Sequence, residues 1–241
     1  MTSLEARHLA DLRFPEVSRA LRALSSTYVE RRGRIGEGAA LSGAGKRAAF
    51  ALFYGPLHYL LVRAIVDELP GAADVRSTLV DLGCGTGAAG AAWAGKQAAP
   101  PVTIGIDRHR WALDEAAKTF RAFGLPLRTR LGDIADADLP KGRTSFLAAF
   151  ALNELPDAGR EGLLKRLLDR ASGGDQVLIV EPLAGAVAPW WKKWASAFES
   201  AGGRADEWRF RLELPPIVLK LDRAAGLHHN EITGRSLSMH M

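Results

Sequence analysis

The spacing of apolar positions along the chain changes at about residue 76. Before this point the spacing is helical, with Leu21, Leu24 and Tyr28 at positions i, i+3 and i+7. After it, short apolar runs alternate with amphipathic stretches, which is typical of a buried parallel sheet covered by helices. The pattern predicts an N-terminal helical cap over residues 1–72 and an α/β domain over residues 73–241.

The same spacing sets the expected elements. Two helices are expected between residues 4 and 32, and Pro15 is suited to open the second. Residues 31–46 are rich in Gly and basic residues and indicate a mobile loop, and a helix from about Ala48 to Leu69 should break or kink at Gly55-Pro56. The expected strands are 79–82, 102–106, 127–131, 145–152, 176–180, 208–212 and 231–237, with helices between them from 88, 110–123, from 157, 190–201 and 217–225.

The most informative stretch is 78–92, TLVDLGCGTGAAGAA. It predicts a short buried strand, a glycine turn and an Ala-rich helix. Gly83, Gly85 and Gly87 stand where side chains would keep a ligand away from the backbone, and the helix start offers free N–H groups. Asp81 lies just before the turn, where its carboxylate can accept a hydrogen bond from a cationic or hydroxylated ligand.

Three interpretations of this turn compete. Gly85, Gly87 and Gly90 also satisfy the dinucleotide pattern G-x-G-x-x-G, but Asp81 would repel a pyrophosphate. A glycine turn without a ligand is the second alternative. The stretch resembles the first motif of class I S-adenosylmethionine-dependent methyltransferases, whose cofactor carries an ammonium and a sulfonium and no phosphate. This resemblance implies a Rossmann-like, mostly parallel seven-stranded sheet with helices on both faces, and S-adenosylmethionine as the cofactor.

Composition narrows the setting of the protein. With 241 residues, 47% hydrophobic and 24% charged, the chain can bury one good-sized core, and we found no stretch with the roughly 18 apolar residues of a membrane span. The N-terminus lacks the pattern of a secretion signal, so a cytoplasmic protein is expected. Cys84 is the only cysteine and is expected to fit as a small side chain under the cofactor. No metal site is expected, because His228-His229 lack partners at useful spacing.

Ligands of open parallel sheets bind beyond the carboxyl ends of the strands, so the residues there are the cofactor candidates. Asp107 follows the second expected strand, where a carboxylate can accept both ribose hydroxyls, with Arg108 beside it. The methyltransferase resemblance implies that Asp133 accepts the adenine amino group and that Ile134 contacts the ring. The alternative for Asp133 is that it only caps a turn.

The fourth strand end is expected to face the methyl group. Methyl transfer is an in-line attack, so the protein must orient the nucleophile and supply a base where the nucleophile carries a proton. Glu154 is the candidate base and Asn153 a candidate hydrogen-bond partner of the substrate. The segment lacks the Asn/Asp-Pro-Pro-aromatic signature of enzymes that methylate base amines, and it lacks the His base of similar O-methyltransferases. A capping turn that leads into the helix at Asp157 is the alternative.

A second resemblance concerns the stretch FALNELPDAGREGLLKRLL and the following QVLIVEP. It is similar to a methyltransferase-like family associated with the mitochondrial small ribosomal subunit, which is implicated in ribosome assembly. The matching residues are Leu152–Leu155, Arg160 and Val180–Pro182, together with Pro56 and Tyr59 in YGPLHY. That family usually carries cluster-binding cysteines after this region, and this chain has none.

Charge suggests where a polyanion would bind. The net charge is +5, and the segment from residue 13 to 63 alone holds nine basic against three acidic residues. Arg31, Arg32 and Arg34 are candidate contacts to RNA phosphates, and Tyr54 and Tyr59 could stack on a base. The alternatives are a solvated helical surface and core aromatic residues.

The sequence therefore predicts an S-adenosylmethionine-dependent methyltransferase acting on RNA, with small-subunit ribosomal RNA as the favoured substrate. Two alternatives stay open. One is a methyltransferase of a small metabolite or natural product, with a pocket lined by the tryptophans at 190, 191 and 194. The other is a ribosome-assembly factor that keeps the cofactor fold without transferring a methyl group.

Overall fold

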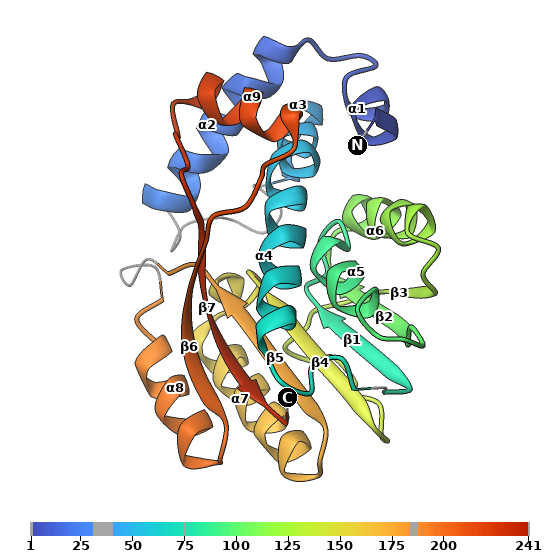
Figure 1. The fold of residues 1–241 in the computed structure, drawn as a ribbon, viewed down its shortest axis with the longest axis vertical. Coiled ribbons are helices and arrows are strands. Elements are labelled where there is room, and N and C mark those ends of the chain that lie inside the picture. The colour runs from blue at the N-terminus through green and yellow to red at the C-terminus, as the bar shows by residue number, and fades with distance from the viewer. Residues whose placement is uncertain (1, 31–40, 75, 184–187, 241) are drawn as a thin grey trace. The chain divides into compact units, whose positions relative to one another are not determined.

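The computed structural model describes residues 2–30, 41–74, 76–183 and 188–240, and it divides the chain into two compact units (Figure 1). The helical unit is 1–58 with 211–232, and the sheet unit is 59–210 with 233–241. This division differs from the predicted boundary after residue 72. Residues 211–232 group with the N-terminal helices because their helix α9, Pro216–Ala225, packs on α2, Phe14–Glu30.

The sheet unit is built on one seven-stranded sheet in the order β3-β2-β1-β4-β5-β7-β6. Its strands are β1 (Thr78–Leu82), β2 (Val102–Asp107), β3 (Leu127–Leu131), β4 (Thr144–Ala149), β5 (Gln176–Glu181), β6 (Arg204–Phe210) and β7 (Ile232–Met239). β1 to β5 are paired in parallel, while β7 runs antiparallel to β5 with Glu181 opposite Arg235. The carboxyl ends of β1 to β5 therefore share one edge of the sheet, as predicted.

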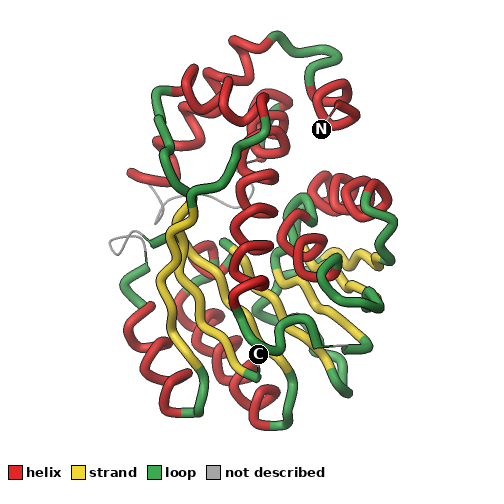
Figure 2. The backbone as a smooth tube through the Cα atoms, in the orientation of Figure 1, coloured by secondary structure: helices red, strands yellow, loops and turns green. Residues whose placement is uncertain are grey.

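Helices cover both faces of this sheet (Figure 2) and alternate with the strands, except between β3 and β4, which are joined by a loop. Their bounds are α5 (Ala88–Ala94), α6 (Arg110–Ala122), α7 (Asp157–Ser172) and α8 (Trp191–Ser200). On one face, Leu163 and Leu167 of α7 and Phe198 of α8 pack in the main core cluster. α5 and α6 cover the other face, where Leu113 and Ala116 join a smaller cluster.

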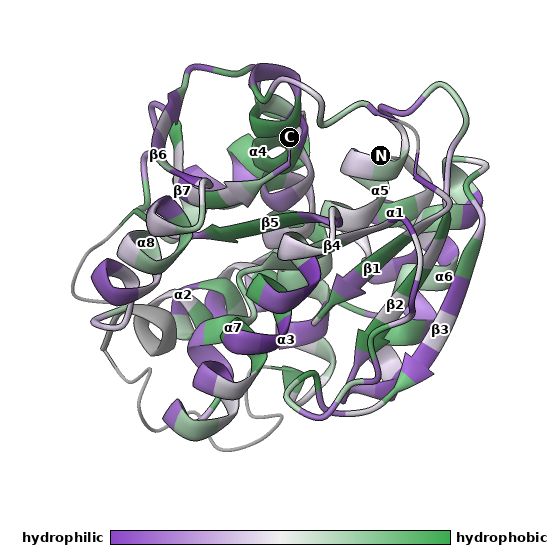
Figure 3. Cartoon of the chain, turned by 90° about the horizontal axis from the view of Figure 1, so that it is seen from below, coloured by the Kyte–Doolittle hydropathy of each residue, from purple (hydrophilic) through white to green (hydrophobic). Residues whose placement is uncertain are grey.

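The hydropathy of each strand follows its place in the sheet (Figure 3). Every residue of β4 and β5 is buried, and β5 is strongly hydrophobic between its polar end residues, Gln176 and Glu181. The edge strand β3 carries Arg128 and Arg130 on an exposed surface. Charged side chains on an edge strand discourage pairing with another sheet edge.

Several predicted boundaries in the sheet unit were wrong by a few residues. β4 ends at Ala149 instead of residue 152, because Phe150 takes a left-handed conformation at φ 59° and the next residues form a short 3-10 helix, η4, Leu152–Glu154. β6 covers 204–210 instead of 208–212. Asp157 is not the cap of α7: Pro156 holds the cap position, and Asp157 pairs with Arg160 within the first turn.

The helical unit begins with α1 (Thr2–His8) and α2, on which Val17, Leu21 and Leu24 form a fully buried stripe. The two leucines of the predicted helical face are thus confirmed, whereas the side chain of Tyr28 lies outside the described residues. α3 (Ala44–Ala49) begins inside the stretch that we expected to be a loop.

A continuous helical run follows, formed by α3, the π-helix η3 (Phe50–Tyr54) and α4 (Gly55–Glu68). The helix does not break at Gly55-Pro56, and the irregularity that was predicted there takes the form of the π-helical turn η3. The Gly55 N–H donates to the Phe50 carbonyl five residues back, and this wider turn accommodates the ring of Pro56.

This run, Ala44–Glu68, is 25 residues long, and its most apolar window has a mean hydropathy of 1.5. By length and composition alone it could cross a membrane, in contrast to our interpretation of the sequence. Half of that window is buried inside the structure, which also fits the core helix of a soluble protein.

The assignment of the buried face of α7 can be tested by matched truncations. Leu167 is fully buried and its neighbour Leu168 only partly. Replacing Leu167 by Ala should lower the free energy of unfolding by about 2–5 kcal/mol, because it leaves a cavity in the core. Leu168→Ala should cost about half as much or less. Urea denaturation measures both, and equal losses would contradict the assignment.

Candidate functional site

The glycine turn between β1 and α5 lies at the carboxyl edge of the sheet. Its three alternating glycines have φ values of 75°, 51° and 74° at Gly83, Gly85 and Gly87, which side chains rarely allow. The N–H groups of Gly83 and Cys84 both donate to the Ile106 carbonyl at 2.8 and 3.0 Å. The turn is thereby attached to the end of β2, where the predicted ribose-binding carboxylate lies.

Two of these glycines are required by contacts within the protein. A Cβ on Gly83 would lie 2.5 Å from the Cβ of Ala151, at the entry to η4. A Cβ on Gly87 would lie 3.0 Å from Ala116 of α6. We expected the glycines to admit a cofactor. The structure adds that they let the turn touch α6 and the end of β4.

Cys84 points into the small cluster beneath the turn, together with Leu113 and Ala116. Its sulfur would be 3.0 Å from a Cβ on Gly105 of β2. Burial, reinforced by the charges of Asp81 and Asp107, raises the pKa of the thiol well above its ordinary value. The side chain is therefore an uncharged packing group.

Asp81 is buried under α5, with only 1% of its surface exposed. Its Oδ2 has no hydrogen-bond partner among the described residues. Burial and, to a lesser extent, Asp107 raise the pKa of Asp81 to about 7, while the Gly90 backbone amide partly opposes them. A cation bound above the turn would favour the charged form of this carboxylate, as a ligand with an ammonium or sulfonium would.

Gly90 is a functional position that the sequence analysis missed. A Cβ there would lie 2.4 Å from Oδ2 of Asp81, so only glycine lets α5 pass over the carboxylate. The sequence feature that could have identified Gly90 is the match of Gly85, Gly87 and Gly90 to the dinucleotide pattern. The third glycine of that pattern serves close packing of helix on strand, and Gly90 serves the same purpose here.

Asp107 ends β2 and is held by two backbone donors. Its Oδ2 accepts from the Gly85 N–H at 2.9 Å and its Oδ1 from the His109 N–H at 2.7 Å. Each carboxylate oxygen keeps a further lone pair that can accept a hydroxyl. The arrangement suits the two neighbouring hydroxyls of a ribose.

The residues predicted to contact adenine follow β3. Oδ1 of Asp133 accepts from the Ala135 N–H at 2.8 Å, so Asp133 does stabilise a turn, and the side chain is exposed. Ile134 is 7% exposed and packs in the main core cluster. Its side chain supports the glycine turn near Gly83, and contact of either residue with adenine stays a prediction.

Asn153 and Glu154 lie on η4, and their contacts differ. The amide of Asn153 donates to Glu181 Oε2 at 2.7 Å and accepts from Trp190 Nε1 at 3.0 Å. Glu154 pairs with Arg108 at 2.8 Å, next to Asp107. Burial raises the pKa of Glu154, the Arg108 guanidinium opposes this, and Asp107 adds to it.

The residues predicted to bind the substrate are spread over the chain. Tyr54 belongs to the helical unit, where its ring meets that of Phe53 edge-on at 5.3 Å. Tyr59 belongs to the sheet unit, and its ring stacks on Phe123 at 5.1 Å. Both rings are therefore engaged in packing. Arg31, Arg32 and Arg34 lie outside the described residues.

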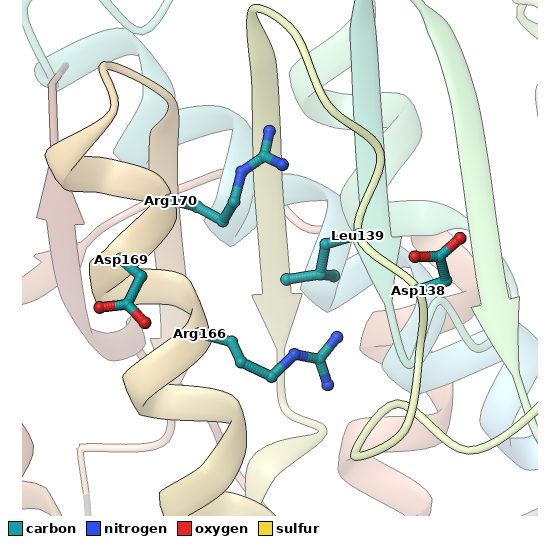
Figure 4. Close-up of a pocket in the computed structure, with 5 residues that line it drawn as sticks. All are labelled: Asp138, Leu139, Arg166, Asp169 and Arg170. Atoms are coloured by element: carbon teal, nitrogen blue, oxygen red, sulfur yellow. The ribbon is translucent and has the colours of Figure 1, made fainter.

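A shallow hollow elsewhere in the sheet unit has a volume of about 280 Å³ and is lined by Asp138, Leu139, Arg166, Asp169 and Arg170 (Figure 4). It lies beside the C-terminal half of α7, which returns toward the amino ends of the strands, away from the glycine turn. Arg166 donates to the carbonyls of Ala135 and Ala137, and Arg170 donates to Asp175. Both guanidinium groups are thus committed to the fold.

Residues 79–172 match the family model of a methyltransferase domain. This range runs from β1 through α7 and contains Asp81, Asp107, Asp133 and Glu154. The chain carries a methyltransferase domain. The orphaned Asp81 oxygen, the glycine turn and the doubly held Asp107 fit S-adenosylmethionine, which is the cofactor of this enzyme.

Solved structures confirm the predicted Rossmann-like methyltransferase fold. An O-methyltransferase family protein from Burkholderia thailandensis aligns with a TM-score of 0.58 and 18% identity, covering 92% of this chain and 71% of that one. Human N-acetylserotonin methyltransferase in complex with S-adenosylmethionine aligns with a TM-score of 0.56 and 16% identity, covering 92% of this chain and 65% of that one. Mitomycin 7-O-methyltransferase aligns with a TM-score of 0.55 and 14% identity, covering 99% of this chain and 71% of that one. No curated protein has significant sequence similarity to this chain.

The contact of Gly83 with Ala151 predicts an effect beyond backbone strain. Gly124 also has a positive φ, 67°, but open space around its Cβ position. Gly124→Ala should cost about 1–2 kcal/mol of stability from the left-handed backbone alone. Gly83→Ala should cost about 1–3 kcal/mol more because of the clash, and should weaken cofactor binding. Denaturation and calorimetric titration with S-adenosylmethionine measure these effects, and equal losses of stability would contradict the clash.

The raised pKa of Asp81 predicts a pH-dependent stability. The folded state binds the Asp81 proton more tightly than the unfolded state, so stability falls as pH rises from about 4 to 7 and levels off above. Between pH 5 and pH 7.5 this contribution is about 2–3 kcal/mol. Asp81→Asn should remove it, so the stability of the variant relative to the native protein should rise across that window. A constant difference between the two proteins, measured by urea denaturation, would argue against the raised pKa.

Proposed function

We propose that this methyltransferase acts on RNA, with ribosomal RNA of the small subunit as the expected substrate. The observation that carries this proposal is a contact network around η4, where we expect the methyl acceptor to bind. Several residues of the ribosome-associated resemblance, Leu152, Asn153, Leu155, Arg160 and Glu181, contact one another there. The Leu152 N–H donates to Glu181 Oε1 at 3.1 Å, and Arg160 Nη1 donates to the Leu155 carbonyl at 2.9 Å.

The charge of the helical unit gives this proposal further support. Arg19 and Arg22 are exposed and lie one turn apart on α2, opposite the buried stripe of that helix. Two guanidinium groups at this spacing can contact neighbouring phosphates. The RNA contacts of Arg31, Arg32 and Arg34 remain part of the proposal on sequence alone.

The chemistry of the sheet edge suits transfer to a neutral nitrogen or oxygen that carries a hydrogen. S-adenosylmethionine supplies a methyl group on a positively charged sulfur. Asp107 holds the ribose hydroxyls, while the charge of Asp81 lies beneath the turn that receives the cationic part. Glu154, whose side chain is 37% exposed and paired with Arg108, accepts the proton of the attacking group. Arg108 keeps this carboxylate beside Asp107.

A small metabolite or natural product is the second candidate acceptor, and two observations favour it. The described strand-end side chains at this edge are largely carboxylates, and the cation among them, Arg108, is already paired with Glu154, so phosphates find little attraction there. The solved methyltransferases that align over 92–99% of this chain include enzymes named for N-acetylserotonin and mitomycin.

A labelling experiment decides between the candidates. The purified enzyme and methyl-labelled S-adenosylmethionine are added to an extract of cells that lack this protein, and RNA, protein and small molecules are separated. Label should appear in small-subunit RNA and be absent with Asp107→Ala, which removes the proposed ribose contact. Label among small molecules would overturn the RNA proposal in favour of the second candidate.

The RNA contacts of α2 can be tested by salt dependence. Replacing Arg19 and Arg22 by Gln should lower the slope of log Kd for RNA against log salt by about 1.5–2, one counterion contribution for each lost phosphate contact. The control replaces Lys220 and Arg223, two exposed cations of α9, and should leave the slope nearly unchanged. Equal changes in both double variants would indicate a general charge effect.

A further inference from the structure

Glu181, which ends β5, is a fully buried carboxylate with 0% exposure. Burying such a group is costly unless donors satisfy it. Both of its oxygens bond to donors on η4, with the Leu152 backbone N–H on Oε1 at 3.1 Å and the Asn153 amide on Oε2 at 2.7 Å. The end of β5 therefore holds the first two residues of the turn that carries Glu154.

The Asn153 side chain has its orientation set from both sides. Glu181 only accepts hydrogen bonds when ionised and an indole nitrogen only donates, so the Asn153 nitrogen faces Glu181 and its oxygen faces Trp190 Nε1. Trp190 is itself packed, with the Arg160 guanidinium 5.3 Å from its ring centroid and the Trp194 ring edge-on at 5.2 Å. The network joins β5, η4 and the start of α8.

Arg235 balances the charge of Glu181. The two residues are opposite each other in the β5–β7 register, and the Arg235 guanidinium lies 4.2 Å above the Trp191 ring. Its Nε and Nη2 have no hydrogen-bond partner among the described residues. Burial lowers the pKa of Arg235, and the charges of Glu181 and Glu207 oppose this. The Glu181 carboxylate thus stabilises the charge of Arg235 on β7 and also holds η4 by hydrogen bonds.

The same contacts reach the cofactor side of the edge. Glu154 directly follows Asn153 and pairs with Arg108, the neighbour of Asp107. We propose that Glu181 is a positioning residue for methyl transfer, which holds η4 so that Glu154 stays on Arg108 and faces the acceptor. This inference rests on the acceptor role of Glu154 in the proposed function. It assigns Asn153 to the support of the turn instead of to the substrate.

The test exchanges the two polar groups of the network. Glu181→Gln turns an amide N–H₂ toward the Asn153 N–H₂ and breaks one contact. Adding Asn153→Asp reverses the polarity of this contact, because the new amide at position 181 then donates to a carboxylate at position 153, which still accepts from Trp190. Glu161→Gln is the matched control, because Glu161 is a carboxylate on the surface of α7 that pairs with Lys193.

The first readout is independent of any acceptor. Arg108→Gln is introduced into the native protein and into the Glu161→Gln control, and in both it should raise the pKa of Glu154. This pKa is measured by carbon NMR of the Glu154 carboxyl group. In Glu181→Gln the change in the Glu154 pKa caused by Arg108→Gln should fall to less than about half of its native size. The double exchange should restore the full change. The indole N–H signal of Trp190, identified by its loss in Trp190→Phe, should move and return in the same way. The Kd for S-adenosylmethionine should change less than about threefold in Glu181→Gln, in the double exchange and in Glu161→Gln, as expected if the cofactor contacts are separate.

The second readout is methyl transfer to the RNA fraction across pH. Glu181→Gln should lower kcat about tenfold, the effect of losing one hydrogen bond to a charged group, and change the acidic limb of the pH profile. The double exchange should recover most of the rate.

An unchanged Glu154 response and Trp190 signal in Glu181→Gln would overturn the positioning role. So would a double exchange that folds but restores neither readout. Should Glu181→Gln fail to fold, Trp190→Phe breaks the network at its other end and should by itself weaken the Glu154 response; a full response would refute the inference. Transfer to small molecules with intact NMR effects would instead refute only the RNA substrate.

Discussion

The site depends on the contact between two turns, the glycine turn after β1 and η4 after β4. Gly83 and Ala151 approach so closely that a single Cβ on Gly83 would lie 2.5 Å from its neighbour. Each turn is also held from outside the contact, the first by the Ile106 carbonyl of β2 and the second by Glu181 of β5. Four strand ends are thereby joined into one rigid edge, which methyl transfer requires because the reacting atoms must be aligned in line.

Two buried carboxylates in this edge have opposite properties. Glu181 has an N–H donor on each oxygen, so its charge is stabilised and can organise the turn beside it. Asp81 has an oxygen without a partner among the described residues beneath α5, and its pKa rises to about 7. The first is suited to a permanent structural task. Asp81 is suited to respond to a positively charged ligand, because the ligand would provide the positive charge that no described side chain places beside this carboxylate.

The side chains around η4 and the start of α8 are aromatic and polar, and most of them contact one another. Trp190 bonds to Asn153 and lies against Arg160, while Arg235 lies over Trp191. Glu154 stands apart from this group, since its partner, Arg108, comes from the cofactor side. The ion pair therefore links η4 to the residue that follows β2, and in the proposed function it places Glu154 to respond to an acceptor.

The amino-acid sequence by itself determined the sheet, the glycine turn and the strand-end carboxylates, because apolar period, glycine geometry and strand polarity are local properties. Thus β1, β2, β3 and β5 were predicted to within a residue, and Asp107 was placed at a strand end. Only the tertiary structure decided what depends on contacts between distant segments. Gly90 is needed because α5 crosses Asp81, Asn153 turns toward Glu181, and residues 211–232 join the N-terminal helices. The spacing of residues along the chain carries no record of such contacts, since they arise when separate strands and helices meet.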